Sequence, residues 1–113
     1  MWRGRGRGRL PTMSDAEPTP DGRYVVVRGR KWRASDPELP APVRQRLVDH
    51  LMAARRDVAS ALRARDAEAE REARANVRRA KEGLGERGTP WWELTVDDRR
   101  RRWERALSDL DPG

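Results

Sequence analysis

Cysteine and phenylalanine are absent from this chain, and histidine occurs once, as His50. The lack of cysteine excludes a disulfide framework and a thiolate metal site, and it is typical of proteins in a reducing cytoplasm. A single histidine without cysteine does not supply an ordinary zinc or iron site. Because His50 lies at helical spacing beside Leu47 and Leu51, we expect it on the flank of a helix. These absences predict a cytoplasmic protein without a metal or another cofactor.

Long hydrophobic runs are also missing. Of the 113 residues 40% are charged and 35% are hydrophobic, and fourteen of the hydrophobic residues are alanines. No apolar run approaches the roughly 20 residues of a membrane span, and the basic start lacks the apolar segment of a secretory signal. The composition therefore predicts one small domain with a thin core, no membrane contact, and stabilisation by self-association or by a protein partner.

The net charge of +7 favours a nucleic-acid partner, but its distribution weakens this inference. From Met13 onward, 22 basic residues stand against 19 acidic residues, which is close to an ordinary balance. The other four basic residues alternate with glycine at the start of the chain: Arg3, Arg5, Arg7 and Arg9. Nucleic acid therefore remains one candidate partner among others.

Residues 1–20 combine this Arg-Gly alternation with three prolines and few apolar residues, which predicts a disordered tail. Two interpretations of its first twelve residues are open. The alternation is typical of flexible RNA-binding tails. Alternatively, Met13 is the true start, and residues 1–12 are not native to the protein.

Residues 21–34 predict a β-hairpin. Asp21-Gly22 is a turn signal before the strand 24–28, which holds the only dense β-branched run of the chain. Gly29 can adopt the positive φ of a tight turn, and residues 30–34 form the returning strand. Since two strands alone are marginally stable in water, we expect this hairpin to pack on helices. Two faces are candidates for burial: that of Val25, Val27 and Trp32, or that of Tyr24 and Val26.

Residues 35–38 predict a short first turn, which Pro40 and Pro42 limit, and residues 41–83 predict a long helical stretch. Ser35 and Glu38 are spaced as a helix-start box with Ser35 as the cap, and Gly83-Leu84-Gly85 is a stop signal. Two apolar stripes recur at steps of three and four residues. The first stripe consists of Val43, Leu47, Leu51, Ala54, Val58 and Leu62. The second stripe consists of Ala69, Ala73, Val77, Ala80 and Leu84.

Residues 41–83 form either one long helix or two helices that fold back on each other. The stripe is interrupted at Arg65-Asp66, and the charges change there from basic to acidic, which suits the dipoles of two helices. The absence of glycine at this point leaves a continuous helix in an intermolecular coiled coil as the alternative. We favour the helical hairpin.

The last part of the chain, residues 93–113, predicts a short helix capped by Thr95, with Arg99 to Arg102 on a solvated face. Four apolar residues fall near one face of this helix: Val96, Trp103, Leu107 and Leu110. The predicted fold is therefore mainly α with a small β element. A β-hairpin packs on a long antiparallel helical hairpin (residues 21–92), after a disordered tail and before a short C-terminal helix.

No catalytic constellation is present, so we expect no enzyme. The serines lack the glycine-framed turn of a nucleophile elbow, and no glycine-rich segment links a strand to a helix as a nucleotide-binding loop would. Instead, basic residues accompany tryptophans, and such surfaces stack bases and hold phosphates. The candidate binding surface consists of Arg28, Arg30, Lys31, Trp32, Arg33, Trp91 and Trp92. The alternative is that Trp32 and one of Trp91 and Trp92 fill the core.

Three motifs in succession resemble a group of small bacterial proteins of uncharacterised function: DGRYVVVRGRKWRASDPELP, LVDHLMAARRDV and AKEGLGERGTPWW. Some members of that group carry a label relating them to Tol-type biopolymer transport. The resemblance covers roughly residues 18–92 and implies a bacterial origin and a start near Met13. It implies no catalytic residue, and the chain shows no membrane span or signal that would support the transport label.

Two functions follow from these observations. The first is a non-enzymatic structural or protein-interaction module that uses the helical stripe and exposed tryptophans. The second is a nucleic-acid-binding protein that uses the arginine- and tryptophan-bearing hairpin. An exposed Trp32 beside Arg30 and Trp91 or Trp92 would support the nucleic-acid function, whereas a buried Trp32 would leave only arginines on the solvent-facing side of the hairpin.

Overall fold

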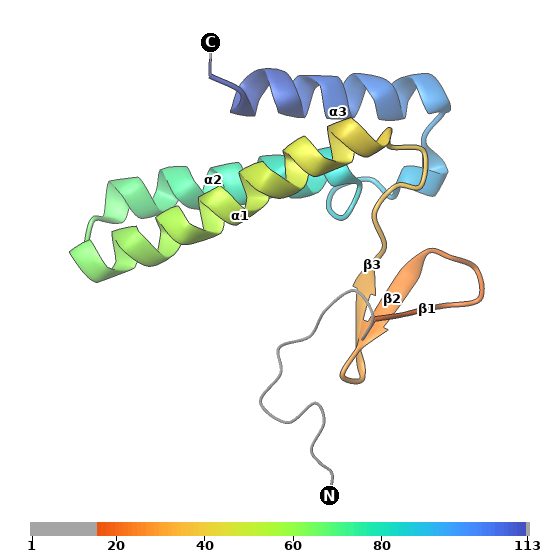
Figure 1. Ribbon diagram of the computed structural model, residues 1–113, viewed down its shortest axis with the longest axis horizontal. Helices are drawn as coiled ribbons and strands as arrows, with labels where there is room; N and C mark the ends of the chain where they lie inside the picture. Colours follow the sequence, from red (N-terminus) through yellow and green to blue (C-terminus); the bar gives the residue numbers. More distant parts are fainter. Residues whose placement is uncertain (1–15, 113) are drawn as a thin grey trace, which may run out of the picture. The chain divides into compact units, whose positions relative to one another are not determined.

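The computed structural model describes residues 16–112 (Figure 1). It confirms a mainly helical fold with a small antiparallel sheet on its N-terminal side. The Arg-Gly alternation and the choice between Met1 and Met13 lie outside the described residues. The elements are β1 (Glu17–Pro18), β2 (Tyr24–Val27), β3 (Arg30–Arg33), α1 (Ala41–Ala64), α2 (Ala67–Leu84), the 3-10 helix η2 (Trp91–Glu93) and α3 (Val96–Leu110).

The chain divides after Ala34 into two compact units. We call the described residues 16–34 the sheet unit and residues 35–112 the helical unit. We predicted that residues 21–92 form one domain, whereas the division after Ala34 separates the hairpin from the helices. The packing of the hairpin on the helical pair stays a prediction.

The sheet unit has three antiparallel strands in the order β1-β2-β3. In the predicted hairpin, β2 and β3 pair so that Val27 faces Arg30, which leaves a two-residue turn of Arg28 and Gly29. Both turn residues have positive φ, 53° and 77°, as a type I′ turn requires. The short strand β1 pairs with β2 and was not expected, because its two residues lie in the segment assigned to the tail.

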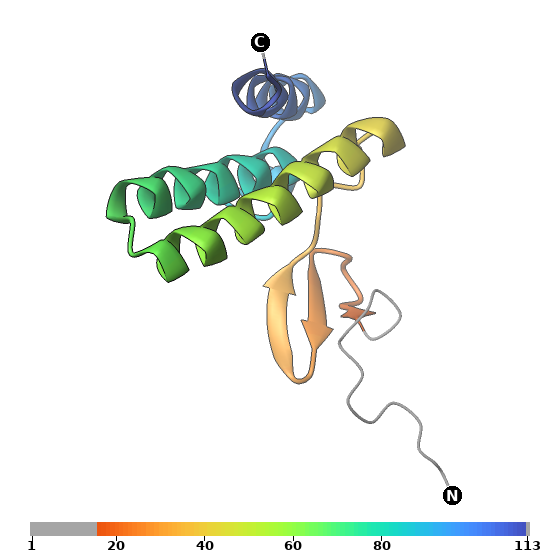
Figure 2. The ribbon, with the colours of Figure 1, turned by 60° about the vertical axis from the view of Figure 1, so that its left-hand side comes forward.

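The helical pair is a hairpin of two helices, as the sequence favoured (Figures 1 and 2). Arg65 ends α1 in the left-handed conformation, with φ 55°, and supplies the reversal that glycine usually provides. Asp66 then caps α2, because its side chain accepts a hydrogen bond from the Ala69 N–H at 3.0 Å. The interruption at Arg65-Asp66 therefore marks the boundary between the helices.

Helix α1 starts at Ala41, where the long helical stretch was predicted to begin, but the predicted cap at Ser35 is wrong. The segment before α1 forms a turn in which the Asp36 carboxylate accepts the Glu38 N–H at 2.8 Å. The Ser35 hydroxyl instead donates to the Glu86 carboxylate at 2.6 Å. Asp36 therefore takes the local capping role that the spacing assigned to Ser35.

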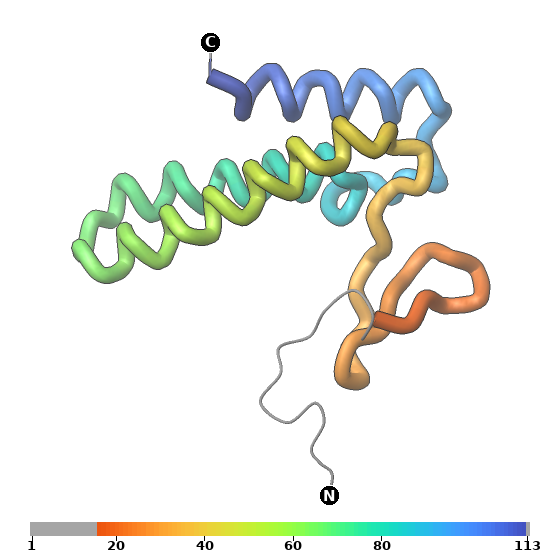
Figure 3. Tube along the Cα trace, viewed as in Figure 1, coloured from red at the N-terminus to blue at the C-terminus, as the bar shows by residue number. Residues whose placement is uncertain are grey.

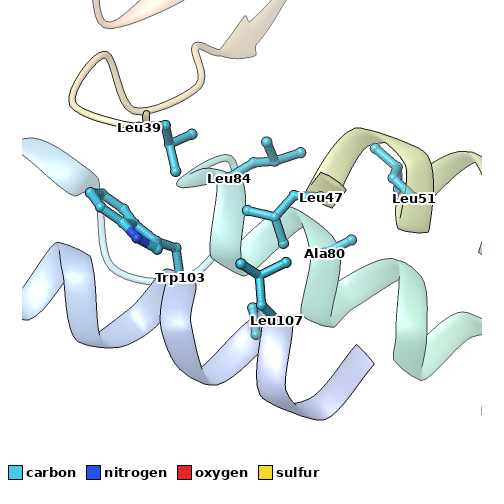
Figure 4. Packing of buried hydrophobic residues seen from close by; sticks show 8 residues of the cluster. Leu39, Leu47, Leu51, Ala80, Leu84, Trp103 and Leu107 are labelled. Atoms are coloured by element: carbon cyan, nitrogen blue, oxygen red, sulfur yellow. The ribbon is translucent and has the colours of Figure 1, made fainter. Parts of the chain in front are cut away.

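The core lies where α3 packs against the helical pair (Figure 4). The tube in Figure 3 shows α3 following the loop after α2, and Figure 2 shows α3 nearly end-on while α1 and α2 run across the view. The buried cluster consists of Leu39, Leu47, Leu51, Ala80, Leu84, Trp103, Ala106 and Leu107. Trp103 and Leu107, which were predicted to fall near one face of the C-terminal helix, belong to this core.

Leu62 and Ala69 of the predicted stripes are exposed rather than buried, and so is Val96 of the predicted C-terminal helix. Leu62 in α1 is 52% exposed, and Ala61 takes the buried position beside α2. Val96 at the start of α3 is also 52% exposed. The small Ala61 suits this position because the facing stripe of α2 consists mostly of alanines, which bring the helix backbones close together.

Candidate nucleic-acid interface

Trp32 lies on strand β3 with 42% of its surface exposed. The guanidinium of Arg30, two residues earlier on the same strand, lies 4.4 Å from the centroid of the indole ring. Alternate residues of a strand share a face, so this cation–π contact belongs to one face of the sheet. The exposure of Trp32 beside an arginine favours the binding interpretation of the hairpin over the buried-core interpretation.

The register assigns every strand residue to one of two faces, because directly opposed residues share a face. The Trp32 face consists of Pro18, Val25, Val27, Arg30 and Trp32. The Tyr24 face consists of Glu17, Tyr24, Val26, Lys31 and Arg33. The second face has its own cation–π contact, in which the Lys31 ammonium lies 4.6 Å from the Tyr24 ring centroid. All four residues of β2 are half-buried, and no residue between 16 and 34 is buried.

The positive charge of the described chain is concentrated in the sheet unit. Residues 16–34 contain five basic and two acidic residues, whereas residues 35–112 contain seventeen basic and sixteen acidic ones. The acidic Asp21 is occupied within its own turn, where its carboxylate accepts the Thr19 hydroxyl at 2.6 Å and the Arg23 N–H at 3.1 Å. Both hydrogen bonds lower the pKa of Asp21, and the one from the Thr19 hydroxyl has the larger effect. The five basic residues are Arg23, Arg28, Arg30, Lys31 and Arg33.

The other two tryptophans of the predicted surface belong to the helical unit. Trp91 in η2 is only 8% exposed, and its ring meets that of Trp92 edge to face with the centroids 5.1 Å apart. The guanidinium of Arg99 lies 5.3 Å from the Trp91 ring. Trp91 is therefore a core residue rather than part of a binding surface, as the alternative interpretation held for one of this pair. The remaining candidates (Arg28, Arg30, Lys31, Trp32 and Arg33) come together in β2–β3 and their turn.

His50 lies on α1, half-buried, with a partner that the sequence did not indicate. Its Nε2 is 2.6 Å from a carboxylate oxygen of Asp111, the residue directly after α3. The guanidinium of Arg46, one turn earlier on α1, pairs with the other oxygen of the same carboxylate. His50 thus helps to hold the end of α3 on α1, and no spacing rule links residues 61 positions apart.

An open cavity of about 390 Å³ lies between α2, α3 and the loop that connects them. Two of its arginines have hydrogen-bond partners within the lining: Arg101 donates to Asp98 at 2.6 Å, and Arg102 donates to the Thr89 carbonyl at 2.6 Å. Four arginines and three carboxylates line it: Arg79, Arg101, Arg102, Arg105, Glu82, Asp98 and Asp109. This mixture provides no distinct preference for a ligand of one charge.

Among residues 16–112, no cluster of three or more histidine, cysteine or acidic side chains is arranged to hold a metal ion. In the same part of the chain, no helix combines the length and the apolar character needed to cross a membrane. A comparison with protein-family models, with curated proteins and with solved structures found no match for this chain, so the resemblance to small bacterial proteins stays a prediction.

Proposed function

We propose that this protein binds nucleic acid through its sheet unit. The observation that carries the proposal is the exposed Trp32 with the Arg30 guanidinium on its ring, in a unit where five basic residues outnumber two acidic ones. Arginine and lysine neutralise phosphates, and an exposed aromatic ring adds stacking on a base. The helical unit, which is nearly neutral and has the continuous core, serves as the folded support of the chain.

The charge supports a measurable salt dependence. If three to five of the sheet cations each contact a phosphate, the slope of log K against log salt is about −2 to −4 for a single strand. Fluorescence anisotropy of a labelled oligonucleotide, titrated with the full chain at several salt concentrations, measures this slope. Absence of binding at low salt would contradict the proposal.

The control variants separate the sheet from the remaining positive charge. The test variant carries Arg28→Gln, Arg30→Gln and Arg33→Gln, and we expect it to lose most of the affinity. Its matched control removes the same charge from exposed positions of α1 with Arg55→Gln, Arg56→Gln and Arg63→Gln, and it should bind almost as well. A shortened chain that lacks residues 1–12 removes the Arg-Gly alternation. Binding that disappears only with those residues would assign the activity to them instead.

A second candidate function is self-association through α1. Met52 and Leu62 are 46% and 52% exposed, and with Val48, Arg55 and Ala59 they repeat at alternating steps of four and three residues. This spacing is that of a coiled-coil seam, although Arg55 interrupts it. Light scattering at increasing concentration tests the idea, because a monomer at every concentration contradicts it. We expect Leu62→Glu to abolish any dimer, whereas Arg56→Glu, outside the seam, should leave it.

A further inference from the structure

We infer that the nucleic acid bound by this protein is single-stranded, and that it lies on the Trp32 face with Arg28 and Arg30 at the hairpin turn. The inference deepens the nucleic-acid function proposed above and rests on it. It names the strandedness of the ligand, the face of the sheet and the residues that make the contact.

The strand residues of each face carry a net charge of +1, but the faces differ in how that charge is made up. The Trp32 face carries the cation Arg30 and no acidic residue. The Tyr24 face carries Lys31 and Arg33 but also Glu17, which faces Val26 across the β1–β2 pair. A carboxylate on this small surface repels phosphate and offsets part of the attraction of the two cations. The larger aromatic ring, with the greater exposure, also lies on the face without an acid.

The turn next to this face has an unusual residue. Arg28 holds φ 53° at the first central position of a type I′ turn, where asparagine, aspartate and glycine are favoured. An L-residue with a long side chain costs folding free energy in this conformation. A strained residue of this kind is a reason to look for a role in function. An arginine that adds a cation at the tip of a basic hairpin supplies such a role.

The tip of the hairpin is also open to a ligand. A Cβ added at Gly29, between Arg28 and Arg30, would meet no atom of the described residues within 4 Å. The space beside the turn backbone is therefore open at this position, which suits the approach of a phosphate. A strand of four residues extends over only about 13 Å, so the contact is short and depends on a few groups.

The aromatic ring determines the strandedness. In a duplex the faces of the bases are stacked on one another, whereas an unpaired base presents its face to an aromatic side chain. The Trp32 indole is 42% exposed and lies 4.4 Å from the Arg30 guanidinium, so a base that stacks on the exposed part of the ring is held next to a cation. A duplex contacts only the cations and gains nothing from the indole.

The test compares one labelled oligonucleotide as a single strand and as a duplex, bound by the full chain at the same salt concentration. We expect the single strand to bind at least about tenfold more tightly, and Trp32→Ala should weaken single-strand binding about tenfold, within the range that stacking on one base provides. The same change should leave duplex binding unchanged. Trp32→Phe keeps an aromatic ring and should retain most of the affinity, which distinguishes stacking from damage to the sheet.

Two further comparisons test the face and the turn. Arg30→Gln and Lys31→Gln remove one charge each from opposite faces, and we expect Arg30→Gln to have the larger effect. Arg28→Asn should stabilise the turn in amide hydrogen exchange while it weakens binding severalfold. A larger effect of Lys31→Gln would overturn the assignment of the face, and unchanged binding by Arg28→Asn would remove the turn from the site.

The outcomes separate this inference from the proposed function. If the chain binds neither form at low salt, the nucleic-acid function is wrong. If it binds both forms equally, with Trp32→Ala unchanged and the arginine variants weaker, the function stands and the single-strand inference is overturned.

Discussion

Asp36 and Arg99 form an ion pair inside the helical unit, with an Arg99 Nη1 to Asp36 Oδ1 distance of 3.4 Å. Asp36 is 3% exposed and is held in place by its backbone N–H, which donates to the Leu84 carbonyl at 2.8 Å. Arg99 also lies over the Trp91 ring, and its buried Nε has no hydrogen-bond partner among the described residues. The pair therefore connects the segment before α1 to α3.

Removing the acid should destabilise the helical unit. Asp36→Ala leaves the Arg99 guanidinium buried without its counter-ion and removes the acceptor of the Glu38 N–H. Breaking a buried pair on one side usually costs more than the pair contributes. We expect a loss of about 2–4 kcal/mol in the free energy of unfolding, measured by urea denaturation followed by circular dichroism.

A double-mutant cycle isolates the pair. Arg99→Met keeps the contact with Trp91 and leaves Asp36 with its backbone hydrogen bonds. Combined with Asp36→Ala, it should cost clearly less than the sum of the two single changes, because both charges are then absent. Strict additivity of the two changes would show that Asp36 and Arg99 do not interact.

Gly83 of α2 lies where α3 approaches closely. A Cβ at this position would lie 2.7 Å from the Ala106 Cβ and 3.0 Å from a Leu47 methyl group. Gly83→Ala should therefore destabilise the helical unit by about 1–2 kcal/mol, although alanine favours the helix itself. Thermal unfolding measures the loss. Adding Ala106→Gly should restore part of it by making room, and a more stable Gly83→Ala protein would contradict the close packing.

Gly83 also illustrates what a stop signal cannot convey. Gly83-Leu84-Gly85 was predicted to end a helix, and Gly85 does end α2 in the left-handed conformation with φ 87°. Gly83 is a helical residue, and its role depends on Ala106, which is far away in sequence. Local rules identify residues that a turn needs, whereas a close contact between helices requires the three-dimensional arrangement.

The turn between α1 and α2 allows a direct test of the helical hairpin. Arg65 adopts φ 55°, which costs an arginine about 1 kcal/mol or more relative to glycine. Arg65→Gly should therefore raise the stability of the helical unit by up to about 1 kcal/mol in chemical denaturation. Asp66→Ala should lower it by about 1 kcal/mol because it removes the cap of Ala69. In a continuous helix Arg65→Gly would instead be destabilising.

The turn between α1 and α2 could be predicted because its two signals are local in the sequence. The apolar stripe is interrupted at Arg65-Asp66, and the charge changes there from basic to acidic. The candidate surface was predictable only as a set of residue types. The sequence could not decide whether Trp32 is exposed, since β-strand periodicity gives two faces but not which one is covered. Trp91 and Trp92 are neighbours with equal local signals, and the burial of Trp91, with Arg99 of α3 over its ring, depends on tertiary packing.

The start of α3 should lose stability in acid. The Asp98 carboxylate accepts a hydrogen bond from the Arg101 guanidinium at 2.6 Å. This hydrogen bond is the main reason why the pKa of Asp98 lies below the usual 3.8, and a hydrogen bond with the Thr95 hydroxyl is the second. The unfolded chain then binds its proton at a higher pH than the folded chain. The contribution of Asp98 is therefore complete above its ordinary pKa and disappears as the pH decreases through the lower, folded value.

The pKa of Asp98 can be followed by NMR titration of its carboxyl carbon in the full chain. Arg101→Gln removes the first cause of the shift, so the pKa should rise towards its ordinary value. Arg100→Gln changes the charge of α3 equally without removing that hydrogen bond, and it should leave the pKa nearly unchanged. If both variants raise the pKa of Asp98 equally, the cause is the general positive field of the arginine run rather than the Arg101 hydrogen bond. A loss of α3 stability that begins well above the ordinary pKa of an aspartate would contradict the direction of the shift.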